Sequence, residues 1–131
     1  MKIDHVAMYV NDLEAEKNFF VKYFNAKAFK FSDFRNEFSY YFLKFEDEST
    51  LIITSENSVD ANKVRYRTGY HQIIISADTR KDVDDFMKKC DVEGVKIVRR
   101  AHNTNSGYYA AAVADPEGNE ISIMALIELP F

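Results

Sequence analysis

Two of the three histidines stand at matching places in a phrase that occurs twice. His5 opens the stretch HVAMYV and His71 opens the stretch HQIIIS, and each stretch leads into a short polar segment and a helical pattern. Moving the first copy forward by 71 − 5 = 66 positions superposes His5 on His71 and Phe20 on Phe86. An imidazole can bind a metal ion or exchange hydrogen bonds with a ligand, so both roles are open for this pair.

Cys90 is the only cysteine, which excludes an intrachain disulfide. A nucleophilic cysteine needs a partner base and an electropositive setting. Cys90 instead closes a helical pattern in register with Val83, Phe86 and Met87. The pattern predicts a buried structural thiol.

The repeat also predicts the architecture, because a duplicated phrase of this length indicates two copies of one module. A strand is predicted where apolar and polar residues alternate or where a short run is apolar throughout, and a helix where apolar residues recur every three or four positions. The first copy predicts a strand over 2–10, a helix over 13–24 and strands over 28–34, 37–45 and 50–55. The second predicts a strand from 70, a helix over 79–90, strands over 95–99, 108–114 and 120–125, and a polar loop over 101–106. We therefore predict one α+β domain over 1–131, with βαβββ modules at 1–55 and 70–127 and a polar connector at 56–69.

Capping residues delimit both predicted helices. Asn11 followed by Glu14 resembles a capping box at the start of the first helix, and Asn25 suits a left-handed cap at its end. Thr79 and Asp82 occupy the corresponding cap positions of the second helix.

Composition narrows the function classes. The formal net charge is −4 and the pI about 5.4, so no general attraction to nucleic acid or to an anionic membrane is expected. No apolar run approaches the ~20 residues that span a bilayer. The chain enters its first strand at once, without a signal-peptide pattern, and the lone cysteine suits a reducing compartment, so we expect a cytoplasmic protein.

The duplicated module, the opening HVAMYVNDLE, the histidine after the connector and the ending DPEGNEISI resemble the vicinal oxygen chelate superfamily. That superfamily includes glyoxalase I, bleomycin- and fosfomycin-resistance proteins, extradiol dioxygenases and methylmalonyl-CoA epimerase. The turn 115–119 before the last strand is the most specific part of the resemblance. The resemblance implies that each module curls its sheet into a half-barrel with a helix on its outer face. It also implies a ligand cleft, formed within one chain or across a homodimer.

In glyoxalase-like members a divalent metal is held by a histidine on the first strand and a glutamate on the last strand of each module. The resemblance thus implies His5 and His71 as ligands, and a possible Ni, Zn, Co, Mn or Fe ion. The two glutamate positions fall at Ile52 and Ser122, and neither residue supplies a carboxylate. Two neutral imidazoles alone make a weak divalent site.

Glu120 is a possible substitute for the missing carboxylates. It stands two residues before Ser122, on the same face of a strand and displaced by ~6.6 Å. With His5 and His71 it would complete a facial triad, or it would act as a catalytic base. In the alternative interpretation the two histidines line the cleft as hydrogen-bonding residues.

Other side chains are candidates for lining the cleft. His102 stands in the predicted loop before Tyr108, and Tyr9 lies on the first strand. Ile52 and Ser122 complete this set. A tyrosine-rich, largely apolar cavity suits a planar or aromatic ligand.

Three hypotheses follow. The first is a divalent-metal lyase or isomerase of glyoxalase I type, or a dioxygenase, acting on a small oxygenated molecule. The second is a metal-free protein that binds and sequesters a small molecule, as in bleomycin resistance. The third is a module that binds a protein partner through the apolar tail 126–131.

Overall fold

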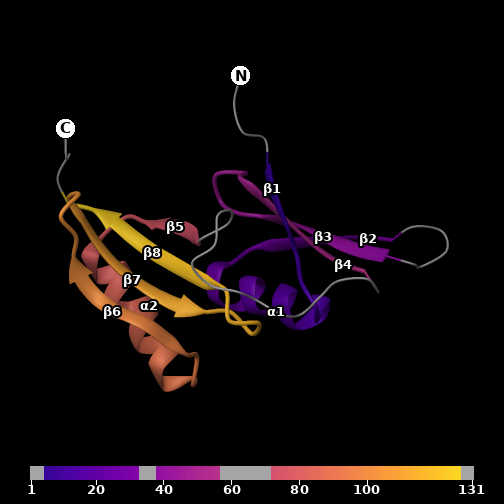
Figure 1. Ribbon diagram of the computed structural model, residues 1–131. Helices are drawn as coiled ribbons and strands as arrows, with labels where there is room; N and C mark the ends of the chain where they lie inside the picture. The colour runs from indigo at the N-terminus through magenta and orange to yellow at the C-terminus, as the bar shows by residue number, and fades with distance from the viewer. Residues whose placement is uncertain (1–4, 33–37, 57–71, 128–131) are drawn as a thin grey trace. The chain divides into compact units, whose positions relative to one another are not determined.

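The computed structural model describes residues 5–32, 38–56 and 72–127. These residues belong to two compact units, Met1–Arg65 and Tyr66–Phe131, called unit 1 and unit 2 (Figure 1). His71, most of the predicted connector and most of the apolar tail lie outside the described residues.

Unit 1 is one helix on a four-stranded sheet. Its elements are β1 (His5–Tyr9), α1 (Leu13–Phe24), β2 (Lys27–Ser32), β3 (Phe38–Lys44) and β4 (Thr50–Glu56). The strand order is β1-β4-β3-β2, with β1 parallel to β4 and the other neighbours antiparallel.

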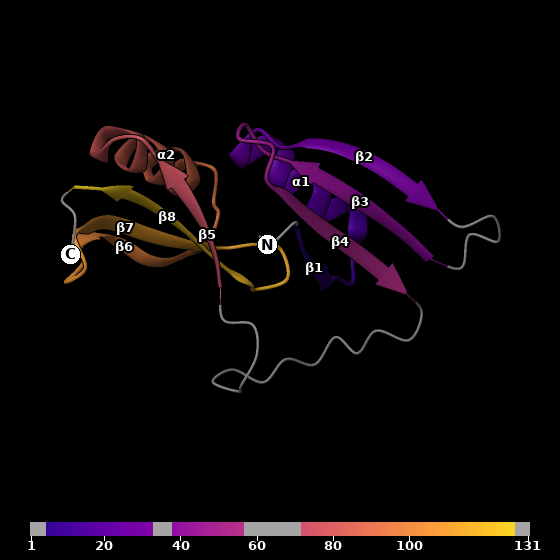
Figure 2. The same ribbon diagram turned by 90° about the horizontal axis from the view of Figure 1, so that it is seen from above.

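Unit 2 repeats this arrangement. Its elements are β5 (Ile73–Ala77), α2 (Arg80–Val92), β6 (Ile97–Asn103), β7 (Tyr108–Ala114) and β8 (Glu120–Leu126). The strand order is β5-β8-β7-β6, with β5 parallel to β8. The predicted pair of βαβββ modules is confirmed, and each sheet is open, with its helix along one face (Figure 2).

Local capping explains where the helices begin and end. Asp12 caps α1 by accepting a hydrogen bond from Ala15 N at 3.0 Å, one residue after the predicted Asn11. Asn25 ends α1 in the left-handed region at φ 53°, as predicted. Thr79 and Asp82 form the predicted capping box of α2.

Each unit has its own apolar core between helix and sheet. In unit 1, Phe20 of α1 and Leu43 and Ile53 of the sheet are fully buried. In unit 2, Val83 of α2 and Ile121 of β8 are fully buried. Strand alternation sends the other set of side chains to the sheet face away from the helix, and the candidate site residues belong to that set.

The prediction for β6 was wrong in its bounds. A strand over 95–99 and a loop over 101–106 were predicted, but β6 runs from Ile97 to Asn103. It is one of the two edge strands of its sheet, and its pairing with β7 is irregular, so polar side chains such as Arg99 and His102 are exposed within a strand. The polar composition of this segment therefore reflects an exposed edge strand and not a loop.

None of the helices in the described ranges is both long and apolar enough to cross a membrane.

Candidate ligand-binding site

The structural repeat differs by one residue from the repeat of sequence identities. The helix caps Asp12 and Thr79 are 67 positions apart, and each side chain accepts from the backbone N–H three residues later. Buried Phe20 corresponds in the same way to buried Met87, not to Phe86. The predicted superposition by 66 positions is therefore wrong by one residue.

The strand pairing decides which residue corresponds to His5. His5 of β1 stands beside Thr50 of β4. In unit 2, Ile73 stands beside Ile121, so the next pair toward the N-terminus is Gln72 and Glu120. The turns before Thr50 and Glu120 carry the same two backbone hydrogen bonds, 70 positions apart, so these two residues correspond. Gln72 thus takes the place that His5 takes in unit 1.

A one-residue slip in a strand moves a side chain to the opposite face, so this correction changes the candidate site. Gln72 shares a sheet face with Ser122, because Ser122 Oγ donates a hydrogen bond to the side-chain oxygen of Gln72. Ser122 is 4% exposed. His71 lies outside the described residues, and its metal-binding role stays a prediction.

In unit 1, the face away from α1 brings together three predicted residues. His5, Ile52 and Tyr9 alternate onto this face of β1 and β4. The His5 ring packs edge-on against Phe42 at 6.4 Å between centroids. Tyr9 is 64% exposed. Ile52 offers a ligand only apolar contact.

Glu120 lies on the same face of β8 as Ser122, where the sequence predicted it. Its carboxylate accepts a hydrogen bond from Arg99 Nη2 at 2.5 Å and is 10% exposed. Glu120 is therefore part of an ion pair across the sheet, and the positive charge of Arg99 would oppose the binding of a metal cation to this carboxylate. No sequence pattern indicates Arg99 as a site residue, because its position depends on the irregular pairing of β6.

The remaining predicted residues of unit 2 share this face. His102 pairs with Ala110 across β6 and β7, and its Nδ1 lies 3.0 Å from the carbonyl oxygen of Arg100. Tyr108 lies two residues before Ala110, so its side chain alternates to the same side. The face of the unit 2 sheet away from α2 thus carries four predicted residues: Tyr108, His102, Ser122 and Glu120.

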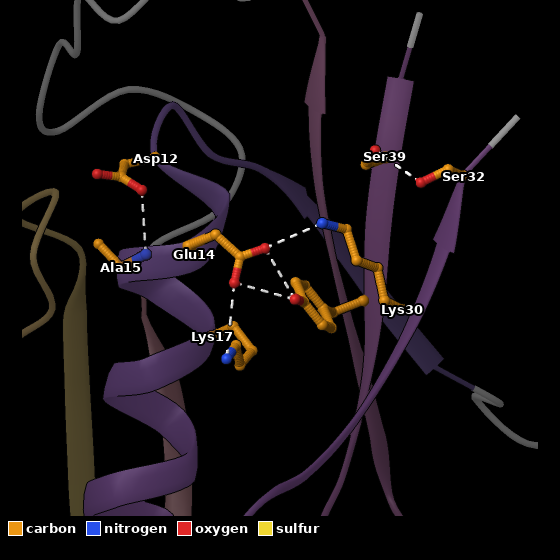
Figure 3. Close-up of polar contacts among 8 residues, drawn as sticks. Asp12, Glu14, Ala15, Lys17, Lys30, Ser32 and Ser39 are labelled. Atoms are coloured by element: carbon orange, nitrogen blue, oxygen red, sulfur yellow. Dashed lines mark hydrogen bonds and ion pairs between the residues drawn. The ribbon is translucent and has the colours of Figure 1, made fainter. Parts of the chain in front are cut away.

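The opposite face of the unit 1 sheet carries a polar cluster that fastens α1. Glu14 accepts hydrogen bonds from Tyr41 Oη at 2.8 and 3.0 Å and from Lys30 Nζ at 3.1 Å (Figure 3). The hydrogen bond from Tyr41, and then that from Lys30, lowers the pKa of Glu14. Burial, and then the hydrogen bond to Glu14, raises the pKa of Tyr41. The cluster lies on the side of the sheet away from His5 and serves the packing of α1.

Cys90 is fully buried in the core of unit 2. Burial raises the pKa of its thiol to about 11. A thiol with this pKa supplies almost no thiolate at neutral pH, so Cys90 is structural, as predicted.

Residues 2–123 match the Glyoxalase/Bleomycin resistance protein/Dioxygenase superfamily. The chain belongs to that superfamily. The predicted resemblance is thereby confirmed for the family and for the fold. No curated protein matches the chain significantly.

Solved structures of the superfamily share the fold. A glyoxylase/bleomycin resistance protein/dioxygenase domain from Frankia sp. EAN1pec is 13% identical, covering 98% of this chain and 93% of that chain, with a TM-score of 0.83. The trypanothione-dependent glyoxalase I of Leishmania major is 22% identical, covering 95% and 86%, with a TM-score of 0.76. The fosfomycin resistance protein FosX from Listeria monocytogenes, complexed with Mn(II) and sulfate, is 16% identical, covering 95% and 91%, with a TM-score of 0.69. Identities this low show the fold alone.

Among the described residues, the side chains at the positions that the resemblance assigns to carboxylate ligands do not fit the superfamily's metal site. At the positions that the resemblance assigns to metal ligands, Ile52 has no donor atom and Ser122 has a hydroxyl already bonded to Gln72. His5 is one imidazole, and in unit 2 an amide takes the matching position. Within residues 5–32, 38–56 and 72–127, no three His, Cys, Asp or Glu side chains are grouped as a metal site. Neither an apolar side chain nor a neutral hydroxyl replaces the carboxylate oxygen that a divalent cation prefers.

Proposed function

We propose that this member of the glyoxalase superfamily binds a small organic molecule without a divalent metal, as a sequestering protein of the resistance type. The supporting observation is the chemistry of the family's ligand positions. An apolar side chain, Ile52, stands at one carboxylate position, and a closed hydrogen-bonded pair, Ser122 with Gln72, stands at the other.

Each unit offers, on its own sheet face, contacts that suit a small organic molecule. Ser122 donates its hydroxyl proton to the Gln72 oxygen, which leaves the Gln72 amide N–H groups as donors to a ligand oxygen. In unit 1, His5, Phe42 and Tyr9 offer rings for apolar contact. Polar groups of the kind found in unit 2, and aromatic surface of the kind found in unit 1, each occur in small-molecule sites.

A second candidate is a divalent-metal lyase or isomerase of glyoxalase I type, acting on a small oxygenated substrate. The named relatives favour it, since one is a glyoxalase I and another was solved with Mn(II). It would use His5, His71 and Glu120 as ligands, with Glu120 also available as the base. It places a metal cation beside the positive charge of Arg99, which makes it the weaker candidate.

Metal content separates the two candidates. Untagged protein is analysed for metals after purification, and again after dialysis against nickel, zinc, cobalt, manganese or iron(II) and removal of the excess. We expect far less than one equivalent of each, unchanged in the His5→Ala variant. Stoichiometric metal that is lost in His5→Ala would overturn the metal-free proposal and justify lyase and dioxygenase assays.

Ligand binding is tested with a neutral aromatic probe. Phenylnaphthylamine fluoresces in apolar surroundings, and its titration reports whether the protein has a binding site for an aromatic body. We expect saturable binding that is the same with and without a chelator. Absence of binding, or loss of binding on chelation, would contradict the proposal.

Two further properties belong to this proposal. We expect a homodimer, because members of the superfamily often form dimers, and a cytoplasmic location. Sedimentation velocity measures the first, and fractionation of the source cells measures the second.

A further inference from the structure

The face of the unit 1 sheet away from α1 carries three rows of side chains, because directly paired residues lie side by side across the strands. Taken from β2 through β3 and β4 to β1, the rows are Lys27, Lys44, Thr50 and His5; Phe29, Phe42, Ile52 and Ala7; and Phe31, Tyr40, Thr54 and Tyr9. At the β2 end, the first row carries two lysines. The second and third rows carry aromatic side chains there. The intervening residues of β2 and β3, such as Lys30 and Tyr41, point to the α1 side instead.

The two aromatic rows form a platform of rings, which we define as Phe29, Phe31, Tyr40 and Phe42. Phe31 stacks on Tyr40 at 5.4 Å between centroids and meets Phe42 edge-on at 5.3 Å. Phe29 is 48% exposed and Phe31 is 46% exposed. The two exposed rings belong to β2, and the partly exposed rings of Tyr40 and Phe42 on β3 lie beside them. Together they offer a planar molecule a surface on which to stack.

Lys27 and Lys44 stand directly opposite each other at the end of this platform. Like charges in a cross-strand pair destabilise a sheet. Both side chains are exposed, and neither has an ion-pair partner within the part of the chain that the structure describes. Lys30, on the other side of the same strand, is paired with Glu14. The lysine pair is therefore a local concentration of positive charge in a chain with a net charge of −4.

We infer that this face binds a planar aromatic molecule that carries an anionic group, with the ring on the platform and the anion at Lys27 and Lys44. Residues two apart on a strand are separated by ~6.8 Å, so the lysine row lies about one substituted ring away from Phe29 and Phe42. The charge complementarity identifies the occupant as anionic, and the exposed rings identify it as aromatic. The inference rests on the proposed metal-free binding function and adds the chemical class of the ligand.

The test compares two probes of similar shape. Anilinonaphthalene sulfonate is an anionic aromatic, and phenylnaphthylamine is its neutral counterpart without the sulfonate. We expect the Lys27→Gln/Lys44→Gln variant to bind the anionic probe roughly three- to tenfold more weakly and the neutral probe as before, since exposed ion pairs contribute modestly. The loss should shrink with added salt, because screening removes the attraction in both proteins.

The Lys88→Gln/Lys96→Gln variant is the matched control, since it removes the same charge from exposed positions in unit 2. It should bind both probes like the unchanged protein. Phe31→Ser should weaken both probes, since it removes an exposed ring of the platform that contacts both Tyr40 and Phe42.

Each outcome decides a separate point. If Lys27→Gln/Lys44→Gln binds the anionic probe unchanged while the neutral probe still binds, the inferred ligand class is wrong and the proposed function stands. If neither probe binds, both proposals fail. If neither probe binds and Phe31→Ser converts a dimer to monomers in sedimentation velocity, the face is covered by a second copy of the chain.

Discussion

Unit 1 and unit 2 place very different side chains at matching positions of their sheets. Phe42 of β3 pairs with Ile52, and Ala112 of β7 pairs with Ser122, so these two pairs correspond. Tyr40 of β3 corresponds in the same way to Ala110 of β7, which belongs to the run AAAVA. One unit therefore presents rings and the other presents methyl groups from the same scaffold.

This difference shows what the module itself determines. Strand order, pairing and helix position are the same in both units, because they follow from caps, turns and the alternation of buried residues. The side chains on the face away from the helix do not hold the module together in the same way, and they differ between the units. The function of each unit therefore depends on these positions more than on the shared fold.

In each unit a tyrosine of the sheet donates a hydrogen bond to a carboxylate of the helix, although the residues do not stand at matching positions. In unit 1, Tyr41 donates to Glu14 of α1. In unit 2, Tyr109 donates to Asp84 of α2 at 2.6 Å, with Arg80 over the tyrosine ring at 4.7 Å. Glu14 and Asp84 are 70 positions apart whereas the helices are offset by 67, so a tyrosine–carboxylate bond joins helix to sheet at a different place in each unit.

The largest expected effect tests whether each unit has its own core. Leu43 and Val113 occupy matching, fully buried positions. We expect Leu43→Ala to lower the free energy of unfolding by about 2–5 kcal/mol, because the substitution leaves a cavity. Hydrogen exchange should show lost protection mainly in unit 1 for Leu43→Ala and mainly in unit 2 for Val113→Ala. Equal loss in both units for either variant would contradict separate cores.

Exchanging the side chains at the matching positions 42 and 112 tests the difference between the sheet faces of the two units. Ala112 is fully buried, so Ala112→Phe should destabilise the protein by about 1–3 kcal/mol through overpacking. Phe42→Ala, on the more open face, should cost less stability but should weaken binding of the neutral probe. Chemical denaturation and probe titration measure the two effects. A larger stability loss in Phe42→Ala than in Ala112→Phe would show that the ring platform is a structural core.

Much of the fold could be predicted from the sequence, because its signals are local. The bounds of α1, the Thr79 capping box and the turn beginning at Asp115 each depend on residues within a few positions of one another. The Asp115 carboxylate indeed accepts hydrogen bonds from the backbone N–H groups of Glu117 and Asn119. Such contacts need no knowledge of distant pairing.

The candidate site was harder to predict because it depends on pairing between distant strands. Matching identities assigned His71 to the position of unit 2 that corresponds to His5. The pairing of β5 with β8 gives that position to Gln72 instead. The ion pair of Arg99 with Glu120 depends on the irregular register between β6 and β7, which leaves no clear signal in composition. An error of one residue in alignment changes the predicted end of a helix only slightly. The same error places a strand residue on the wrong face of its sheet.

The smallest expected effect concerns the tyrosine–carboxylate bonds. Tyr41→Phe should lower the free energy of unfolding by about 0.5–1.5 kcal/mol near neutral pH, because it removes a hydrogen bond to a charged group that is half exposed. Glu14 has a lowered pKa in the folded state, so its contribution is present above the ordinary value of 4.5 and is lost as pH falls through the folded pKa. Tyr41 has a raised pKa, so its contribution is present below 10.0 and is lost as pH rises through the folded pKa.

The stability difference between the unchanged protein and Tyr41→Phe should therefore be flat around neutral pH and shrink at both extremes, as measured by urea denaturation across the pH range. Tyr109→Phe is the matched change in unit 2. The pKa of Tyr109 is raised first by its hydrogen bond to Asp84, so its contribution should also fall at high pH. Tyr41 is 7% exposed and Tyr109 is more open to solvent, so the unit 1 variant should show the larger loss. A larger loss for Tyr109→Phe would mean that the bond in unit 2, not the one in unit 1, is the stronger link between helix and sheet.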